Sequence, residues 1–575
     1  MPIHNADIAA IFSEIADLLE IEGANPFRIR AYRNAARIVG EWSRELRTLV
    51  EHGEDLTKLP GIGADLAAKI REIVETGKCR ALEKLRQELP PAITELLHIP
   101  GLGPKRVRTL WHELDIQTLE QLARAARDGR IRQLPGFGAK TEANILQAVA
   151  QHLSQARRIK LVTAAQYAAS LVAWLKAAGA VERIEVAGSF RRARETVGDL
   201  DLLVATRDPA AVMRRFTAYE EVREVLAAGE ARGSVILKSG LQVDLRVITP
   251  AAWGAALLYF TGSKAHNIAL RKLAQEAGLK LNEYGLFRGR ERLAGASEEE
   301  VYAALGLEWI PPELRDDRGE IGAARAHRLP RLVTLADLRG DLHAHTQATD
   351  GHDTLAAMAA EAQRLGFEYL AITEHSRRLT MAHGLDARRL LEQCEQIDRL
   401  NETFHGFRLL KGIEVDILED GSLDLPDDVL GELDLVVGAI HSRFELSRAQ
   451  QTERILRAME RPFFTILAHP TGRLIDGRPP YDVDMARIVR AAKQRGCFLE
   501  LNAHPERLDL TDSDCLLAKD EGVLVAIDSD AHSRADFAHL RFGVGQARRG
   551  WLEARDVLNT RPLAELMPLL ARTRR

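Results

Sequence analysis

The chain has 575 residues and a formal net charge of −4, with 79 basic and 83 acidic side chains. Because single hydrophobic cores stop growing at about 250–300 residues, a chain of this length is expected to hold several domains. The balanced charge excludes a uniformly basic nucleic-acid-binding surface, so any DNA contact must be local.

The cysteines and the apolar segments indicate where in the cell the protein is expected to be found. Four cysteines are spread over the chain without a C-x-x-C pair, so neither a disulfide framework nor a zinc ribbon is expected. The N-terminus is interrupted by Asp and Glu, and no apolar run is long enough to span a bilayer. We therefore expect a soluble, cytoplasmic protein with no membrane contact.

Residues 5–150 are predicted to form short helices that carry a repeat. Three segments share the pattern apolar helix end, Pro-Gly-x-Gly, helix start, with their glycines at Gly61, Gly63, Gly101, Gly103, Gly136 and Gly138. Such a turn exposes amide groups at a helix N-terminus, which suits a DNA phosphate and reads no base. A single copy would more readily be a packing turn. A dinucleotide-binding fingerprint is disfavoured, because the third glycine and the preceding strand are lacking.

The segment GSFRRARETVGDLD, from Gly188 to Asp201, is predicted to join two strands: it begins as a turn after the apolar run of Ile184, Val186 and Ala187, and it leads through Asp199 and Asp201 into Leu202, Leu203 and Val204. Asp199 and Asp201 then point to one face, and Asp244 of LQVDLRVI can join them from a neighbouring strand. Three carboxylates suit Mg²⁺ with a substrate phosphate completing its shell. The residues placed to contact that phosphate are Gly188, Ser189, Arg191 and Arg192. A lone D-x-D would more readily be an exposed strand edge, but the ordered set favours a two-metal phosphoryl-transfer centre.

Residues 311–337 are charged and Pro-rich, which predicts a linker, and the pattern changes after them. Apolar runs alternate with amphipathic helices, as in a β/α barrel whose chemistry collects at the carboxyl ends of its strands. Candidate metal ligands follow nearly every run: His343, His345, Asp350, His375, Glu414, His441, His469, Asp530 and His532. One such histidine would be an ordinary structural residue, but nine ligands predict a multinuclear site. Imidazole-rich ligand sets favour Mn²⁺, Zn²⁺ or Fe²⁺ over Mg²⁺.

Residues beside these ligands fall into two groups. Asp341, Glu374 and Asp528 stand next to ligands and are expected to support them. The other candidates, for substrate contact, are His383, His504 and Arg473, with an ordinary surface role as the alternative.

The palm motifs resemble the nucleotidyltransferase superfamily, which includes the family X DNA polymerases of the polymerase beta type, and the repeats resemble helix-hairpin-helix motifs. The resemblance implies an N-terminal lyase domain in which Lys69 forms a Schiff base with an abasic sugar, beside Tyr32. One neighbouring lysine of the family pattern is Asp65 here, and an acidic neighbour raises a lysine pKa and weakens the nucleophile. A solvated helix residue is therefore an equal alternative for Lys69.

The string YFTGSKAHNIALRKLAQEAGLKLNEYGLF also resembles the family X polymerases. It implies that Tyr259, Phe260 and Gly262 form the pocket of the incoming nucleotide and exclude a 2′-hydroxyl. Asn267 would meet the minor-groove edge of the nascent pair, and Arg271 the template side. Without the whole string, Tyr259 and Phe260 would be ordinary core residues of an apolar helix.

The nine-ligand segment resembles the PHP phosphoesterases, and the domain order resembles the bacterial and archaeal PolX enzymes. The implied fold is all-α helix-hairpin-helix domains, an α+β palm and thumb, and a distorted α/β barrel. The expected domains are 1–85 (lyase-like, first hairpin), 86–150 (two further hairpins), 151–250 (palm), 251–315 (thumb), 316–337 (linker) and 338–575 (PHP).

The resemblance implies a polymerase that fills short gaps in base excision repair, with a 3′–5′ exonuclease, and cleavage at abasic sites, in the PHP domain. The implied partners are gapped or primer-template DNA and deoxynucleoside triphosphates, bound by a monomer associated with the nucleoid. The implied cations are Mg²⁺ in the palm, Mn²⁺ or Zn²⁺ in the barrel and a monovalent cation at the hairpin turns. The alternatives are a PHP phosphoesterase on an inert polymerase-like scaffold, a DNA-end binding module with two vestigial sites, and a small-molecule phosphatase.

Overall fold

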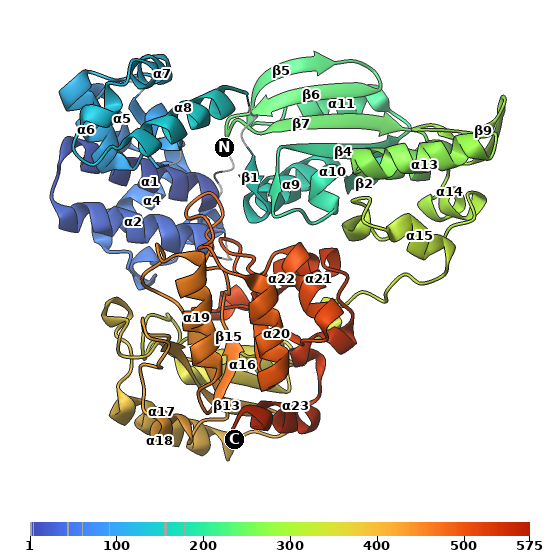
Figure 1. Cartoon of the computed structure of the whole chain (residues 1–575). Helices are drawn as coiled ribbons and strands as arrows, with labels where there is room; N and C mark the ends of the chain where they lie inside the picture. The colour runs from blue at the N-terminus through green and yellow to red at the C-terminus, as the bar shows by residue number, and fades with distance from the viewer. Residues whose placement is uncertain are drawn as a thin grey trace.

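A computed structural model describes residues 3, 5–42, 45–59, 61–90, 93–99, 101–154, 158–177 and 179–574. Figure 1 shows three bodies along the chain: the N-terminal helices in blue, a sheet with its helices in green, and a barrel in yellow to red. The fold class expected from the sequence is confirmed in each of them. Pro60 and Pro100 of the repeats lie outside the described residues.

The N-terminal body is all helical. Its helices are α1 (Asn5–Glu22), α2 (Pro26–Glu41), α3 (Leu46–Glu51), α4 (Ala64–Thr76), α5 (Arg80–Glu88), α6 (Pro104–Leu114), α7 (Leu119–Arg127) and α8 (Ala139–Ser154). The apolar residues that predicted the first helix, such as Phe12 and Ile15, are buried on one face of α1. The two expected helical domains share one apolar cluster, which extends from Ile3 to Val149.

The palm is a five-stranded sheet in the order β2-β4-β7-β6-β5, in which only β4 and β7 are parallel. The strands are β2 (Val181–Val186), β4 (Asp199–Thr206), β5 (Val222–Ala228), β6 (Arg232–Leu237) and β7 (Gln242–Ile248); β1 (Ile159–Lys160) pairs with β3 (Thr196–Val197). Leu202 and Val204 of β4 face helices α9 (Leu161–Lys176) and α11 (Pro209–Thr217). Leu203 and Ala205 face α12 (Trp253–Thr261) on the other side. By strand alternation, Asp199 and Asp201 share the α12 side.

The two expected strands on either side of Gly188 are confirmed as β2 and β4, but the turn between them begins with a short helix. Gly188–Arg191 forms the short helix α10, and strand structure resumes only at Thr196. Gly188 has φ +63°, a left-handed conformation that favours glycine and turns the chain directly into the helix. The turn residue was recognised in the sequence, but its conformation was not.

The thumb follows the palm and includes a three-stranded sheet. Its elements are α12, α13 (Lys264–Glu276), β8 (Lys280–Asn282), β9 (Gly285–Arg288), β10 (Glu291–Ala294) and α14 (Glu298–Ala304). Glu298 is 4% exposed and accepts paired hydrogen bonds from Arg191 at 2.8 and 2.9 Å and from Arg315 at 2.7 and 3.0 Å. Burial raises the pKa of Glu298, but Arg315 and Arg191 outweigh it and lower that pKa to about 2. This ion cluster ties the thumb to the palm.

Replacing Glu298 with Gln should lower the free energy of unfolding by about 3–5 kcal/mol, because it leaves buried arginines unpaired. The folded-state pKa lies below the ordinary 4.5, so this stabilisation is present above pH 4.5 and is lost as the pH falls toward 2. The difference in the free energy of unfolding between Glu298→Gln and the wild type, measured by urea unfolding, should therefore become smaller below pH 4.5. Glu299→Gln, on the exposed side of the same helix, is the control. A difference that stays constant with pH would contradict the ionic origin.

The expected linker, residues 316–337, contains a short helix in its first half and a helical turn at its end. It contains α15 (Glu320–Arg325) and a 3₁₀ turn at Leu335–Asp337. Glu320 is fully buried and lies 2.6 Å from Nδ1 of His266 in the thumb. This contact between Glu320 and His266 holds the segment against the thumb. It joins residues that are far apart in the chain, so it leaves no periodic signal in the sequence.

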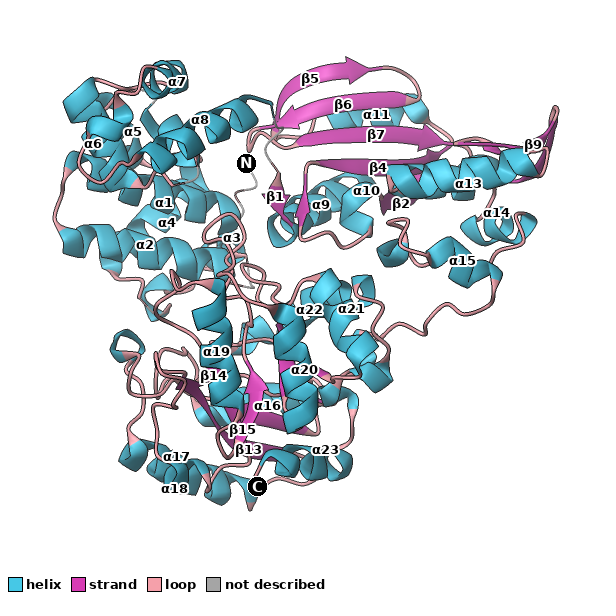
Figure 2. Cartoon of the chain, viewed as in Figure 1, coloured by secondary structure: helices cyan, strands magenta, loops and turns pink. Residues whose placement is uncertain are grey.

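The C-terminal body is a barrel of parallel strands, drawn in magenta and surrounded by helices in Figure 2. The strands are β11 (Gly340–Asp341), β12 (Tyr369–Ile372), β13 (Arg408–Asp416), β14 (Leu435–Ala439), β15 (Phe464–Leu467), β16 (Phe498–Asn502) and β17 (Val525–Asp528). A bridge between Ala344 and Ala531 joins the first strand to the last and nearly closes the ring. The helices are α16 (Leu355–Arg364), α17 (Ala387–Asn401), α18 (Asp427–Leu430), α19 (Arg448–Met459), α20 (Met485–Arg495), α21 (Asp512–Glu521), α22 (Leu540–Arg549) and α23 (Leu563–Leu570).

Arginines fasten the barrel to the palm and thumb. Arg549 of α22, 2% exposed, donates to Asp316 at 2.6 Å and to the backbone carbonyl of Arg192 at 3.1 Å. Arg473 of the barrel donates to Glu195 of the palm at 2.7 Å. Because these pairs are largely buried, they hold the two bodies in a fixed relation more firmly than exposed pairs would.

Two expectations about the whole chain can be checked directly. Among the described residues, no helix is both long and apolar enough to cross a membrane. All four cysteines are free and buried: Cys79, Cys394, Cys497 and Cys515.

Candidate active sites in the palm and the barrel

The structure brings the three palm aspartates together. Asp201 on β4 is the direct partner of Asp244 on β7, and Asp199 precedes Asp201 on the same face. One carboxylate oxygen of each residue lies within 4.8 Å of the other two. The parallel pairing of β4 with β7 produces this convergence, because it sets the two strands in register at the acidic positions.

The electrostatics of this cluster fit a bound cation. Burial, then repulsion from Asp199 and Asp244, raises the pKa of Asp201 to about 7. Oδ1 of Asp244 is buried without a hydrogen-bond partner among the described residues. Crowded carboxylates with an unused oxygen are the donor set that a hard divalent cation prefers.

The predicted phosphate contacts lie beside the carboxylates, with one exception. A Cβ atom at Gly188 would overlap the carboxylate of Asp201, so only glycine fits there. Arg192 donates to the carbonyl of Thr261, and burial lowers its pKa to about 10. Ser189 follows Gly188 in the short helix α10. Arg191 was expected to bind phosphate as well, which is wrong, because Glu298 and Thr261 occupy its guanidinium.

The candidate nucleotide pocket lies at the junction of α12 and α13. The rings of Tyr259 and Phe260 meet edge to face at 5.2 Å between centroids. Asn267 donates to the carbonyl of Tyr259 at 2.7 Å, and Arg271 donates to the carbonyl of Asn267 at 3.3 Å. A Cβ atom at Gly262 would lie 3.1 Å from Nη1 of Arg192, so this glycine joins the pocket to the phosphate side.

The hairpin glycines adopt the geometry that the repeat predicted. Gly61, Gly101 and Gly136 have φ values of +68°, +87° and +82°, and helices α4 and α6 begin directly after Gly63 and Gly103. The first residues of α4 and α6 receive no side-chain cap. Their amide groups remain available to an anion.

Lys69 lies on α4, at the edge of the N-terminal core. Its Nζ donates to Asp65, and Tyr32 lies beside it. Burial lowers the pKa of Lys69, but Asp65 and Tyr32 outweigh it, so that the pKa is raised. The structure therefore shows the acidic neighbour acting as the sequence suggested, and the lyase role of Lys69 stays a prediction.

In the barrel, the nine candidate ligands gather at the carboxyl ends of the strands. Three groups have ligand atoms within 4.8 Å of one another: His345, Asp350, His375 and His532; His343, His345 and Asp530; His375, Glu414 and His441. The ninth, His469, places Nε2 3.0 Å from Oε1 of Glu414. Because the groups share His345 and His375, they form one connected cluster rather than three separate sites.

Two carboxylates that orient the ligands were missed in the sequence. Glu500 on β16 lies 2.5 Å from Nδ1 of His343, and Asp416 on β13 lies 2.8 Å from Nδ1 of His441. Each fixes the ring so that Nε2 points at the cluster. Asp416 stands two positions after Glu414 on one strand, a spacing that could have revealed it. Glu500 carries no comparable local signal.

Of the three carboxylates expected to support the ligands, Asp341 and Asp528 accept from backbone amides, and Glu374 accepts from threonine hydroxyls. Asp341 accepts from the amides of His343 and Ser529, and Asp528 accepts from the amide of Leu342. Glu374 binds the hydroxyls of Thr346 and Thr349. These contacts shape the strand ends that carry the ligands.

The donor set of the barrel fits transition-metal ions. Burial, together with the charges of His532 and His375, lowers the pKa of His345 to about 3, so its ring is neutral and able to ligate. Nε2 of His343 and Nδ1 of His345 are buried without hydrogen-bond partners in the described part of the chain. Unpartnered imidazole nitrogens and carboxylates in one connected cluster are a donor set for divalent metal ions, and the choice of Mn²⁺, Zn²⁺ or Fe²⁺ stays a prediction.

The three candidate substrate contacts separate in the structure. His504 lines a cavity together with His441 and Asp530. His383 is exposed on a surface turn, and Arg473 is committed to Glu195 and to backbone carbonyls. Only His504 is therefore placed to meet a substrate of the barrel.

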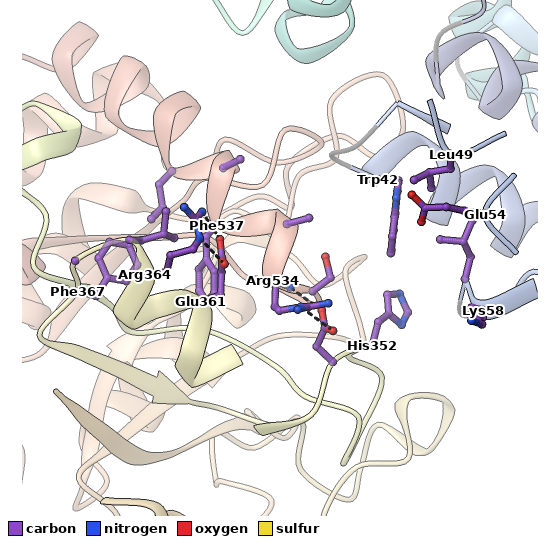
Figure 3. Close-up of a pocket in the computed structure, with 18 of the residues that line it drawn as sticks. Trp42, Leu49, Glu54, Lys58, His352, Glu361, Arg364, Phe367, Arg534 and Phe537 are labelled. Carbon is purple, nitrogen blue, oxygen red and sulfur yellow. Dashed lines mark hydrogen bonds and ion pairs between the residues drawn. The ribbon is translucent and has the colours of Figure 1, made fainter. Parts of the chain in front are cut away.

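A larger cavity of about 1700 Å³ lies elsewhere, between the N-terminal helices and the barrel. Trp42 and Lys58 lie on one side of it, and Arg364 and Phe537 on the other (Figure 3). None of the candidate ligands lines it, so its size does not make it the site of the chemistry.

Comparison with known proteins agrees with this architecture. Family models match a helix-hairpin-helix domain (3–79), a SAM-like helix-hairpin-helix tandem (93–150), the DNA polymerase beta thumb (256–316) and a PHP domain (341–504). The chain is 38% identical over 574 residues to "DNA polymerase/3′-5′ exonuclease PolX" of Bacillus subtilis (strain 168), covering 99% of this chain and 100% of that protein. The chain thus belongs to the PolX family, the family X DNA polymerases that carry a PHP domain.

Shorter relatives match about a third of the chain. A "Probable phosphatase" of Thermoanaerobacter sp. (strain X514) is 31% identical over 232 residues, which is 38% of this chain and 89% of that protein. Another from Acetivibrio thermocellus is 32% identical over 205 residues, 33% of this chain and 78% of that protein.

Proposed function

We propose that this protein is a DNA-directed DNA polymerase that fills short gaps and also removes nucleotides from 3′ ends through its PHP domain. The observation that carries the proposal is the presence of two carboxylate-bearing clusters in one chain. Asp199, Asp201 and Asp244 converge in the palm, and the nine-ligand cluster lies in the barrel. The family membership of the whole chain supports the same pair of activities.

In the palm, each residue has a defined task. Asp199 and Asp201 would hold two Mg²⁺ ions, with Asp244 as a ligand on the primer side. When bound, the ions neutralise charge on the phosphate oxygens and favour ionisation of the primer hydroxyl. Arg192 and Ser189 would hold the pyrophosphate that leaves as the 3′ oxygen bonds to the α-phosphorus. Tyr259 and Phe260 would exclude a 2′-hydroxyl by occupying its space.

In the barrel, imidazoles and carboxylates would hold Mn²⁺ or Zn²⁺. Such ions lower the pKa of bound water, so that it can attack phosphorus near neutral pH. Glu500 and Asp416 keep His343 and His441 oriented for this task. The scissile bond joins the terminal phosphate to the 3′ oxygen of the preceding nucleotide, which leaves with a proton.

The helical domain would hold the DNA without reading its sequence. The amides after Gly61, Gly101 and Gly136 would face backbone phosphates, with a monovalent cation at the turns. Short-gap repair, cleavage at abasic sites, lyase activity of Lys69, a monomeric state and a nucleoid location remain predictions from the family resemblance.

Metal removal tests the proposal. EDTA should abolish both extension of a gapped primer and digestion of a 3′ end, since both sites need cations for charge neutralisation. Adding Mg²⁺ back should restore extension, and adding Mn²⁺ back should restore digestion, because one site is built of carboxylates and the other is rich in imidazole. Full digestion with Mg²⁺ alone would contradict the assignment of the barrel cations.

A further inference from the structure

The nine-ligand cluster of the barrel, called the metal cluster below, lies at a cavity that is enclosed by three domains. The cavity has a volume of about 1200 Å³ and is lined by His375, Glu414 and His441 of the cluster. Its other walls come from helices α1 and α2, from the segment 158–167 of the palm and from the turn 238–241 between β6 and β7. A substrate that reaches the cluster through this cavity therefore meets the N-terminal helices and the palm as well.

The walls away from the metal cluster are basic, although the whole chain carries a net charge of −4. The basic side chains from the palm and the N-terminal helices are Arg33, Arg37, Arg158, Lys160, Arg223 and Lys238. Apart from the candidate ligands, the acidic lining residues are Asp7, Asp476 and Glu506. Glu506 pairs with Lys160, Asp7 accepts from Tyr167, and Arg33 pairs with Asp17 and Glu20 of α1. The balance suits a polyanion such as a nucleic-acid backbone.

Arg507 supplies a second, independent observation at the inner end of the cavity. Its side chain is 19% exposed, and its Nε lies 3.7 Å from Oδ2 of Asp530, a candidate ligand. Nη1 of Arg507 is buried and has no hydrogen-bond partner among the described residues. A buried guanidinium nitrogen without a partner beside a metal cluster is suited to a phosphate oxygen.

The size and lining of the cavity define the form of the nucleic acid. Duplex DNA occupies on the order of 1000 Å³ per base pair, so the cavity holds roughly one base pair or a few nucleotides of one strand. Apart from Asp7, the wall formed by α1 consists of small residues, Ala6, Ala9, Ala10 and Ser13, which leave this space open. Among the described lining residues there is no Phe or Trp, Tyr167 is only 3% exposed, and the remaining aromatic rings are the histidines at and beside the candidate ligands, so the outer walls offer no ring on which bases could stack. Contacts must therefore be made mainly to phosphates.

We propose that this cavity binds the single-stranded 3′ segment of the strand that the barrel digests, so that α1, α2 and the palm form part of the nuclease site. Arg507 holds a phosphate next to the metal cluster, and Arg37 and Arg223 hold phosphates further from it. This inference rests on the proposed exonuclease and adds the N-terminal helices and the palm to its substrate site.

The test compares two charge reversals on one helix of the full-length protein. The first variant is Arg37→Glu, since Arg37 lines the cavity. The second is Arg28→Glu, since Arg28 lies on the same helix, α2, and does not line the cavity. The substrates are a single-stranded oligonucleotide and the p-nitrophenyl ester of thymidine 5′-monophosphate, which is too small to span the cavity. For Arg37→Glu, the ratio of oligonucleotide to ester activity should fall at least about tenfold, and the KM for the oligonucleotide should rise. The slope of log kcat/KM against log salt should flatten by about 0.7, and Arg28→Glu should match the wild type.

A steric variant provides a second readout that does not depend on charge. Ala10→Trp adds an indole ring to the exposed wall of α1 and should also reduce the oligonucleotide to ester ratio. The inference is overturned if the wild type digests the oligonucleotide and both cavity variants keep its ratio and its salt slope. A wild type that hydrolyses the ester but no oligonucleotide would instead overturn the proposed exonuclease itself.

Discussion

Asp244→Asn should reduce extension of a gapped primer by at least about 10³-fold and leave 3′ digestion at the wild-type rate. The substitution keeps the shape of the side chain but removes the charge that we propose to lie on the primer side, and electrostatic stabilisation contributes most to the rate of phosphoryl transfer. Oδ1 of Asp244 is buried without a hydrogen-bond partner in the described structure, which leaves it available to a cation. The loss should appear in kcat, measured as single-nucleotide incorporation at saturating substrate.

Glu185→Gln is a matched control, because Glu185 lies on β2 of the same sheet but is exposed and outside the aspartate cluster. It should extend primers at the wild-type rate. Two outcomes would contradict the palm assignment. Normal extension by Asp244→Asn would place the chemistry elsewhere, and a wild type that digests but never extends would favour the inert-scaffold alternative.

His343→Ala should show the reverse pattern, with 3′ digestion reduced by at least about 10³-fold and primer extension retained. Nε2 of His343 lies 3.6 Å from Glu414 and 3.6 Å from Asp530, so its removal opens the centre of the cluster. It also leaves Glu500 buried without its imidazole partner. Metal content measured on the purified variant should fall together with digestion.

The control for this variant is His405→Ala, since His405 is exposed in the same domain and is not a candidate ligand. Its metal content and digestion should equal those of the wild type. If His343→Ala kept both its metal and its nuclease activity, the barrel would not be the nuclease.

The sequence predicted the residues whose chemistry is repeated or periodic. Strand alternation places Asp199 and Asp201 on one face of β4, and the sequence allowed Asp244 to join them from a neighbouring strand, as the pairing of β4 with β7 does. The ligands of the barrel follow successive apolar runs, so the fold rule that gathers strand ends also gathers His343 and Asp530. In both places, local spacing and a simple topology were sufficient.

The sequence did not predict contacts that depend on residues far apart in the chain. Arg191 stands next to Arg192, but its guanidinium donates to Glu298, which lies more than a hundred positions away in the chain. Arg191 is therefore not available to a phosphate. Glu500 reaches His343 only because β16 and β11 are strands of the same barrel. The charge and type of these residues are visible in the sequence, but the choice among many partners is made by tertiary packing.

The contact of Arg549 with Asp316 and with the carbonyl of Arg192 implies that the two enzymatic halves are not separable modules. A chain truncated before residue 338 would lack Arg549, which makes the shortest ion pair with Asp316, and would keep the longer pairs from Arg194 and Arg318. Asp316, whose Oδ1 lies 3.7 Å from Nε of Arg192, would then carry more uncompensated charge and should compete more strongly with a triphosphate for that arginine. We therefore expect deletion of the nuclease domain to weaken nucleotide binding by the polymerase.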